Sequence, residues 1–203
     1  TLDSTGEIVK GGRIPSAEEI EAALPAFLGE IDQVPPKYSA KSVDGRRGYA
    51  LARAGVDFTL PAKRVTIDSF TLLGEGNEEN SYRFSVRCGA GTYIRSLARD
   101  LGAALGTNAL MSALTRTKSG KFSIENAVLP DELTEENIEE YIIPTERVLD
   151  LPLLVVGEND RLFTGIKTKV NAADGEYMLY RGAQFYGVAA VENGSFVSVT
   201  KLC

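Results

Sequence analysis

The residue types available for chemistry in this chain are restricted, because it contains no histidine. This excludes Ser-His and Cys-His nucleophile pairs, histidine-ligated metals and the side chain that most often acts as a general base. The two cysteines, Cys88 and Cys203, are too few for a Cys-rich zinc site or a disulfide scaffold, so we expect a reducing compartment. Any reaction must therefore use carboxylate, phenol, ammonium, guanidinium or backbone groups.

One tyrosine and two arginines lie at the point where a predicted strand is followed by a predicted helix. Residues 81–88 alternate as a strand does, and apolar residues from Ile94 onward recur at helical spacing. Tyr93 lies at this junction, and Arg95 and Arg99, four residues apart, project together from the predicted helix. By type alone, such a tyrosine is more often part of the core, and such an arginine is usually solvated.

Tyr93, Arg95 and Arg99 must be positioned by the strands and helices around them. The order of these predicted elements indicates an α+β fold with a mixed, mostly antiparallel sheet and helices on one side. Ser16 to Glu19 form a capping box that begins a helix, and 65–73 pairs with 81–88 as a hairpin. A basic helix is expected to carry Arg46, Arg47 and Arg53, and Lys63 with Arg64 to lie in an exposed loop.

The remainder of the chain predicts a second, smaller module. We expect an acidic helix at 131–140 and a linker between Pro144 and Pro152. Short strands and glycine turns follow, with a hairpin at Asn193-Gly194. We place the boundary between 1–150 and 151–203, the second part being all-β.

Charge is distributed unevenly, although the net charge is only −6. Residues 37–121 carry 14 Lys and Arg against 7 Asp and Glu, whereas both flanking segments are acidic. A basic central segment is what a polyanion-binding face requires, but an uneven solvated surface would give the same counts. No run approaches the roughly 20 apolar residues of a membrane helix, so we expect no membrane partner.

Three segments carry a resemblance to a known family. They are Gln33-Val34-Pro35-Pro36-Lys37-Tyr38-Ser39-Ala40-Lys41 with the following Gly45–Gly55 stretch, Cys88-Gly89-Ala90-Gly91-Thr92-Tyr93-Ile94-Arg95, and Leu114-Thr115-Arg116 with Ser119-Gly120-Lys121-Phe122. In this order they closely resemble the bacterial tRNA pseudouridine synthase B family over roughly 1–150, and the tail resembles that family's small PUA-like RNA-binding module. The resemblance implies the pseudouridine synthase fold and isomerisation of uridine 55 in the T-loop of tRNA.

The resemblance also implies roles for individual residues. Tyr93, Arg95 and Leu114 would line the pocket for the extruded base, and Arg95 would hold the catalytic carboxylate ionised through bidentate contact. The residues that would bind the RNA are Lys37, Tyr38, Lys41, Arg46, Arg47, Arg53, Arg99 and Arg116. Neither a cofactor nor a metal is implied.

The family's nucleophile is an Asp in a Gly-Thr-Leu-Asp-Pro motif, and Thr1-Leu2-Asp3 resembles part of it. Because Ser4 to Val9 instead match a segment downstream of the catalytic loop, we do not assign Asp3 as the nucleophile. We expect the nucleophilic Asp upstream of Thr1 and the 203-residue chain to be an inactive fragment.

Two other function classes stay open, namely a non-catalytic RNA-binding module and a different enzyme on a similar scaffold. The expected partner is tRNA. We expect a cytoplasmic, monomeric full enzyme and a fragment that is able to self-associate through exposed sheet edges.

Overall fold

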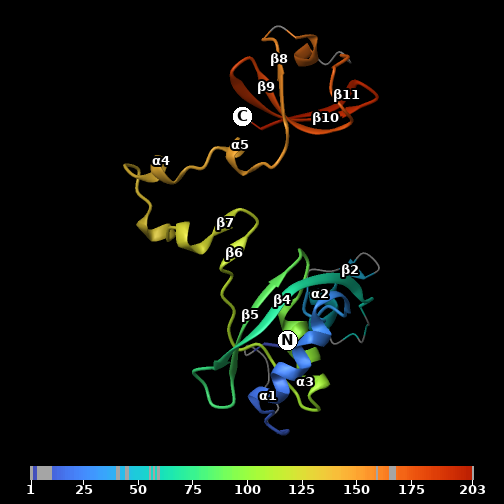
Figure 1. The fold of residues 1–203 in the computed structure, drawn as a ribbon, viewed down its shortest axis with the longest axis vertical. Helices are drawn as coiled ribbons and strands as arrows, with labels where there is room; N and C mark the ends of the chain where they lie inside the picture. Colours follow the sequence, from blue (N-terminus) through green and yellow to red (C-terminus); the bar gives the residue numbers. More distant parts are fainter. Residues whose placement is uncertain are drawn as a thin grey trace. The chain divides into compact units, whose positions relative to one another are not determined.

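The protein divides into two compact units, Thr1–Thr115 and Arg116–Cys203, in a computed structural model (Figure 1). The structure describes residues 2–3, 11–39, 42–43, 46–54, 56, 58, 60–158, 160–164 and 168–202. The compact units divide between Thr115 and Arg116, which is 35 residues before the predicted domain boundary at 150/151. Whether 116–150 belongs functionally to the first domain stays a prediction.

The first unit is built on a three-stranded antiparallel sheet in the order β1-β4-β5. These strands are β1 (Gly29–Gln33), β4 (Lys63–Glu75) and β5 (Tyr82–Cys88). The predicted hairpin of β4 and β5 is confirmed, and its apolar positions pack toward the core while Arg83 and Arg87 are exposed. The interpretation of Lys63 and Arg64 as a loop is wrong, because pairing with β1 extends β4 to include both residues.

Helices cover one face of this sheet. The first is α1 (Ala17–Ala23), whose predicted capping box is present, because the Ser16 hydroxyl accepts from the Glu19 N–H and the Glu19 carboxylate accepts from the Ser16 N–H. It continues into the 3-10 helix η1 (Leu24–Phe27). The second α-helix of this face is α3 (Ile94–Ala104), which comes after β5 in the sequence.

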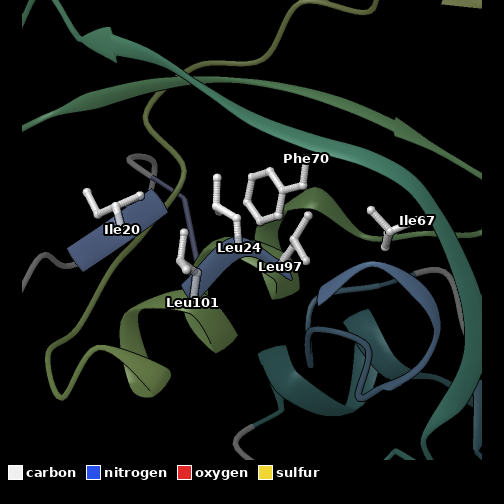
Figure 2. Packing of buried hydrophobic residues seen from close by; sticks show 6 residues of the cluster. All are labelled: Ile20, Leu24, Ile67, Phe70, Leu97 and Leu101. Carbon is white, nitrogen blue, oxygen red and sulfur yellow. The ribbon is translucent and has the colours of Figure 1, made fainter. Parts of the chain in front are cut away.

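Six apolar side chains fill the space between sheet and helices (Figure 2). They are Ile20, Leu24, Ile67, Phe70, Leu97 and Leu101. Each such side chain contributes roughly 1.5–3 kcal/mol when fully buried. This burial fixes α3, and with it the strand-to-helix junction, against the sheet.

The predicted basic helix is partly wrong. Arg46–Arg47 form strand β3, paired antiparallel with β2 (Ser42–Val43), and the helix α2 comprises only Gly48–Arg53. Val43 pairs with Arg46, so two residues connect the strands, which is the length of a hairpin turn. Arg46 and Arg47 therefore belong to the second strand of a hairpin and not to a helix. The predicted turn residues Asp44 and Gly45 themselves lie outside the described residues.

The second unit holds a four-stranded sheet in the order β11-β10-β9-β8. The strands are β8 (Leu153–Val156), β9 (Gly175–Arg181), β10 (Gln184–Glu192) and β11 (Ser195–Lys201), with β8 parallel to β9 and the rest antiparallel. The predicted hairpin is confirmed, with Asn193 and Gly194 at φ 51° and 67°, the left-handed values that a two-residue turn requires.

Between Arg116 and Asp150 the chain forms only short elements. These are β6 (Lys118–Ser119), β7 (Phe122–Ser123), η2 (Ile124–Asn126), η3 (Pro130–Glu132), α4 (Ile138–Tyr141) and α5 (Thr145–Val148). The predicted acidic helix at 131–140 is present only at its end, where α4 begins at Ile138, and is wrong for the residues before it. The Asn137 side chain instead accepts from the Thr134 N–H at 2.8 Å and donates to the Glu132 carbonyl at 2.9 Å, which favours turns over a continuous helix. The α+β fold with mostly antiparallel sheets is confirmed.

Candidate functional site

The start of α3 is held by a buried amide that the sequence analysis did not identify. Gln33, at the end of β1, is 1% exposed. Its Nε2 donates to the Tyr93 carbonyl at 3.2 Å, and its Oε1 accepts from the Tyr93 N–H at 2.8 Å. A polar Gln33 followed by an exposed Val34 does not fit the alternation that marks a buried strand position. Only the tertiary contact therefore shows the role of Gln33.

The residue after Gln33, Val34, is hydrogen-bonded to the same helix. The Val34 carbonyl accepts from the Ser96 hydroxyl at 2.8 Å and from Nη2 of Arg99 at 3.0 Å. Ser96 is fully buried, and Arg99 also pairs with Asp100 at 2.7 Å. These contacts fix the direction in which the Pro35-Pro36-Lys37-Tyr38 segment leaves β1.

Arg95 lies between two segments that are distant in sequence. Its Nη1 donates to the Asp3 carboxylate at 3.0 Å, and its Nη2 donates to the Tyr38 carbonyl at 3.1 Å. The Arg95 and Asp3 side chains are 24% and 20% exposed, so this ion pair is largely shielded from solvent. The backbone of Asp3 is placed by a parallel bridge to Met111. The guanidinium is therefore oriented by a carboxylate on one side and a carbonyl on the other.

A cavity of about 360 Å³ adjoins this ion pair through Tyr38. It is lined by Leu2, Val34, Pro35, Pro36, Lys37, Tyr38, Phe58, Leu60 and Arg99. Most of the lining is apolar, with two cations and a phenol among it, which suits a flat heterocycle attached to a phosphate backbone. Tyr93, half-buried at the N-cap of α3, is not part of this lining.

The structure thus brings together part of the expected site. Lys37, Tyr38 and Arg99 line the cavity, and Arg95 contacts Tyr38. Leu114 is 56% exposed near the end of the first unit. The structure assigns Arg116 to the second unit, so its position relative to the cavity stays a prediction.

The remaining expected RNA-binding residues lie around β2 and α2. Arg53 is exposed at the end of α2. For Arg46 and Arg47 the structure gives the backbone of β3 and not the side chains, and Lys41 lies outside the described residues.

Ser39 directly follows Tyr38, which lines the cavity. Ser39 is 6% exposed, and its Oγ has no hydrogen-bond partner among the described residues. Across those same residues, no group of three or more His, Cys, Asp or Glu is arranged to hold a metal ion. None of the helices in the described ranges combines the length and apolar character that a bilayer-spanning helix needs.

The fold itself is shared with a solved structure. One chain in the crystal structure of a Cbf5-Nop10-Gar1 complex matches 95% of this chain with a TM-score of 0.65 and 22% identity, and 62% of that chain is covered. This likeness defines the protein as an α+β protein of that architecture.

Sequence comparison is more specific. Residues 1–94 match the N-terminal domain of the TruB family pseudouridylate synthases, and residues 95–150 match the tRNA pseudouridylate synthase B C-terminal domain. The chain belongs to the TruB family of pseudouridylate synthases.

Several curated relatives carry the name tRNA pseudouridine synthase B. The one from Caulobacter vibrioides is 41% identical over 79% of this chain, and the one from Synechocystis is 42% identical over 74%. The one from Acaryochloris marina is 38% identical over 96% of this chain and is covered to 70% of its length. The chain spans about half the length of the first two, 53% in each case.

Proposed function

We propose that the protein is a tRNA pseudouridine synthase that isomerises uridine 55 of the T-loop. The observation that carries this proposal is the oriented guanidinium of Arg95 beside an apolar cavity with cationic walls, in a chain of the TruB family. A base inside a folded loop must leave its stack before its glycosidic bond can be changed, so a cavity of this kind is needed.

The reaction rearranges one nucleotide without an oxidant or reductant. The bond between N1 and C1′ of uridine breaks, a bond between C5 and C1′ forms, the C5 proton is released to solvent and N1 gains a proton. In this proposal Arg95 is a positioning residue that keeps the nucleophilic carboxylate ionised and oriented through its planar fork of donors. From the family resemblance we also propose that Tyr93 and Leu114 contact the base, although neither lines the cavity itself.

We further propose that the nucleophile is not Asp3. Arg95 engages the Asp3 carboxylate, but the sequence context of Asp3 differs from the motif expected for the nucleophile. The 203-residue chain then lacks turnover by itself, whereas a chimera with the N-terminal portion of the Caulobacter relative has it.

We propose that residues 151–203 act as a PUA-like RNA-binding module. The residues proposed to contact tRNA phosphates are Lys37, Lys41, Arg46, Arg47, Arg53 and Arg116. Each such contact adds salt-dependent affinity. tRNA is the partner in this proposal, the cytoplasm is the compartment, and the full enzyme is a monomer.

Release of tritium from tRNA labelled at uridine C5 tests the function directly. We expect release by the chimera, none by the 203-residue chain, and none from a transcript with cytidine in place of uridine 55. Release by the 203-residue chain that is lost in Asp3→Asn would instead make Asp3 the nucleophile. Binding of tRNA without release by the chimera would favour the non-catalytic RNA-binding module.

A further inference from the structure

Lys63 is the first residue of β4 and lies on the face of the sheet that carries α3. It is the register partner of Gln33, and directly opposed residues of an antiparallel pair place their side chains on the same face of a sheet. That face is also the face of Val65, which is buried. Lys63 thus belongs to the side of the sheet that carries the Gln33–Tyr93 contact.

The Lys63 ammonium lies over the turn that leads into α3. A Cβ placed on Gly91 would be 2.7 Å from the Lys63 Nζ, so the space beside this glycine is occupied by the cation. Gly91 has a φ of +83°, a backbone conformation that L side chains rarely adopt. The turn is further fixed by the Thr92 hydroxyl, which donates to the Gly89 carbonyl at 2.9 Å.

Lys63 differs from its basic neighbours in having no carboxylate partner among the described residues. Arg64 pairs with Asp32 at 3.5 Å and with Glu30 at 3.9 Å on the opposite face. No ion pair joins the Lys63 ammonium to an acidic residue within the described ranges, and its side chain is exposed. The three residues Gly89, Ala90 and Gly91 of the turn below it carry no side chain larger than the methyl group of Ala90.

We propose that Lys63 binds a backbone phosphate of the RNA that reaches the turn before Tyr93. The inference rests on the proposed function, because it requires RNA at this end of the sheet. A compact ammonium is an effective point charge for phosphate, and the neutralisation of one phosphate releases condensed counterions. Lys63 lies beyond the basic segments that the family motifs identify, and it extends the RNA contact to the sheet side of Tyr93.

The test compares two variants with identical loss of charge on adjacent residues, Lys63→Gln and Arg64→Gln. Binding of an unmodified tRNA transcript to the 203-residue chain is measured over a range of salt concentrations. We expect Lys63→Gln to weaken the Kd about 3- to 10-fold and to reduce the slope of log K against log salt by about 0.7–0.9. Arg64→Gln should change the Kd by less than about 2-fold, because its charge is already paired.

Equal weakening by both variants would overturn the assignment, since it would reflect net charge alone. A Kd and salt slope unchanged by Lys63→Gln would overturn it as well. If the wild-type chain fails to bind tRNA at low salt, the inference and the proposed RNA partner both fail. That result is distinguishable from the first two, in which wild-type binding persists. Circular dichroism of both variants verifies that the fold is retained.

Discussion

Gln33 holds the backbone of Tyr93 from both sides, donating to its carbonyl at 3.2 Å and accepting from its N–H at 2.8 Å. The contact joins the end of β1 to the first residue before α3, sixty positions later in the chain. It therefore sets the position of the junction from which Tyr93 and Arg95 project.

Replacement of Gln33 by Met should destabilise the protein while nearly preserving side-chain volume. Two backbone groups of Tyr93 lose their partner in a buried site, at a cost of about 1–3 kcal/mol for each group left unsatisfied. Urea unfolding measures the change, with Gln184→Met at an exposed strand position as the control. Equal stability of Gln33→Met and wild type would show that water replaces the amide.

Arg95→Lys should separate catalysis from binding in the chimera with the N-terminal portion of the Caulobacter relative. A lysine places a point charge near Asp3 but cannot donate in two fixed directions to Asp3 and Tyr38 as the guanidinium does. We expect turnover to fall by about 10- to 100-fold and the Kd for tRNA to change by less than about 3-fold. The same substitution at exposed Arg64 is the control, and a parallel loss of turnover and affinity in Arg95→Lys would contradict the positioning role.

The acid sensitivity of the first unit should depend on Glu19. The Arg13 guanidinium donates to both of its carboxylate oxygens, at 2.9 and 2.7 Å, and together with the Ser16 N–H lowers the pKa of Glu19 below its ordinary value of 4.5. A lowered folded-state pKa stabilises the protein at pH values above 4.5, and this stabilisation is lost as the pH falls through the folded pKa.

Urea midpoints measured between neutral pH and about pH 3 test this prediction. The midpoint of the wild type should fall more steeply below pH 4.5 than that of Glu19→Gln, which has no carboxylate to protonate. Glu21→Gln removes the same charge from the same helix and serves as the control. Parallel profiles for wild type and Glu19→Gln would show that the Arg13 contact does not persist in solution.

Ser39→Ala should leave stability unchanged or raise it by up to about 1 kcal/mol, because it removes a buried hydroxyl that has no partner among the described residues. The measurement is again urea unfolding, with exposed Ser198→Ala as the control. A loss of more than about 1 kcal/mol would reveal a hydrogen bond to this hydroxyl in solution.

Local patterns predicted the elements whose cause is local. The Ser16–Glu19 capping box, the alternation of β5 and the Asn193-Gly194 turn each depend on residues a few positions apart, and the structure has all three. The basic helix at Arg46–Arg47 and the continuous acidic helix over 131–140 were wrong for a different reason. Strand pairing and side-chain turns outweighed helix propensity there.

The sequence by itself determined the family, the strand-to-helix junction and the residue types available for chemistry, because motifs and periodicity are carried by neighbouring positions. Only the tertiary structure decided that Gln33 reaches Tyr93, that Asp3 pairs with Arg95 and that the Lys63 ammonium lies over Gly91. These contacts join residues that are 28 to 92 positions apart. Such contacts form when the apolar face of a helix is buried against the sheet, and no local pattern in the sequence specifies which polar groups that burial brings together.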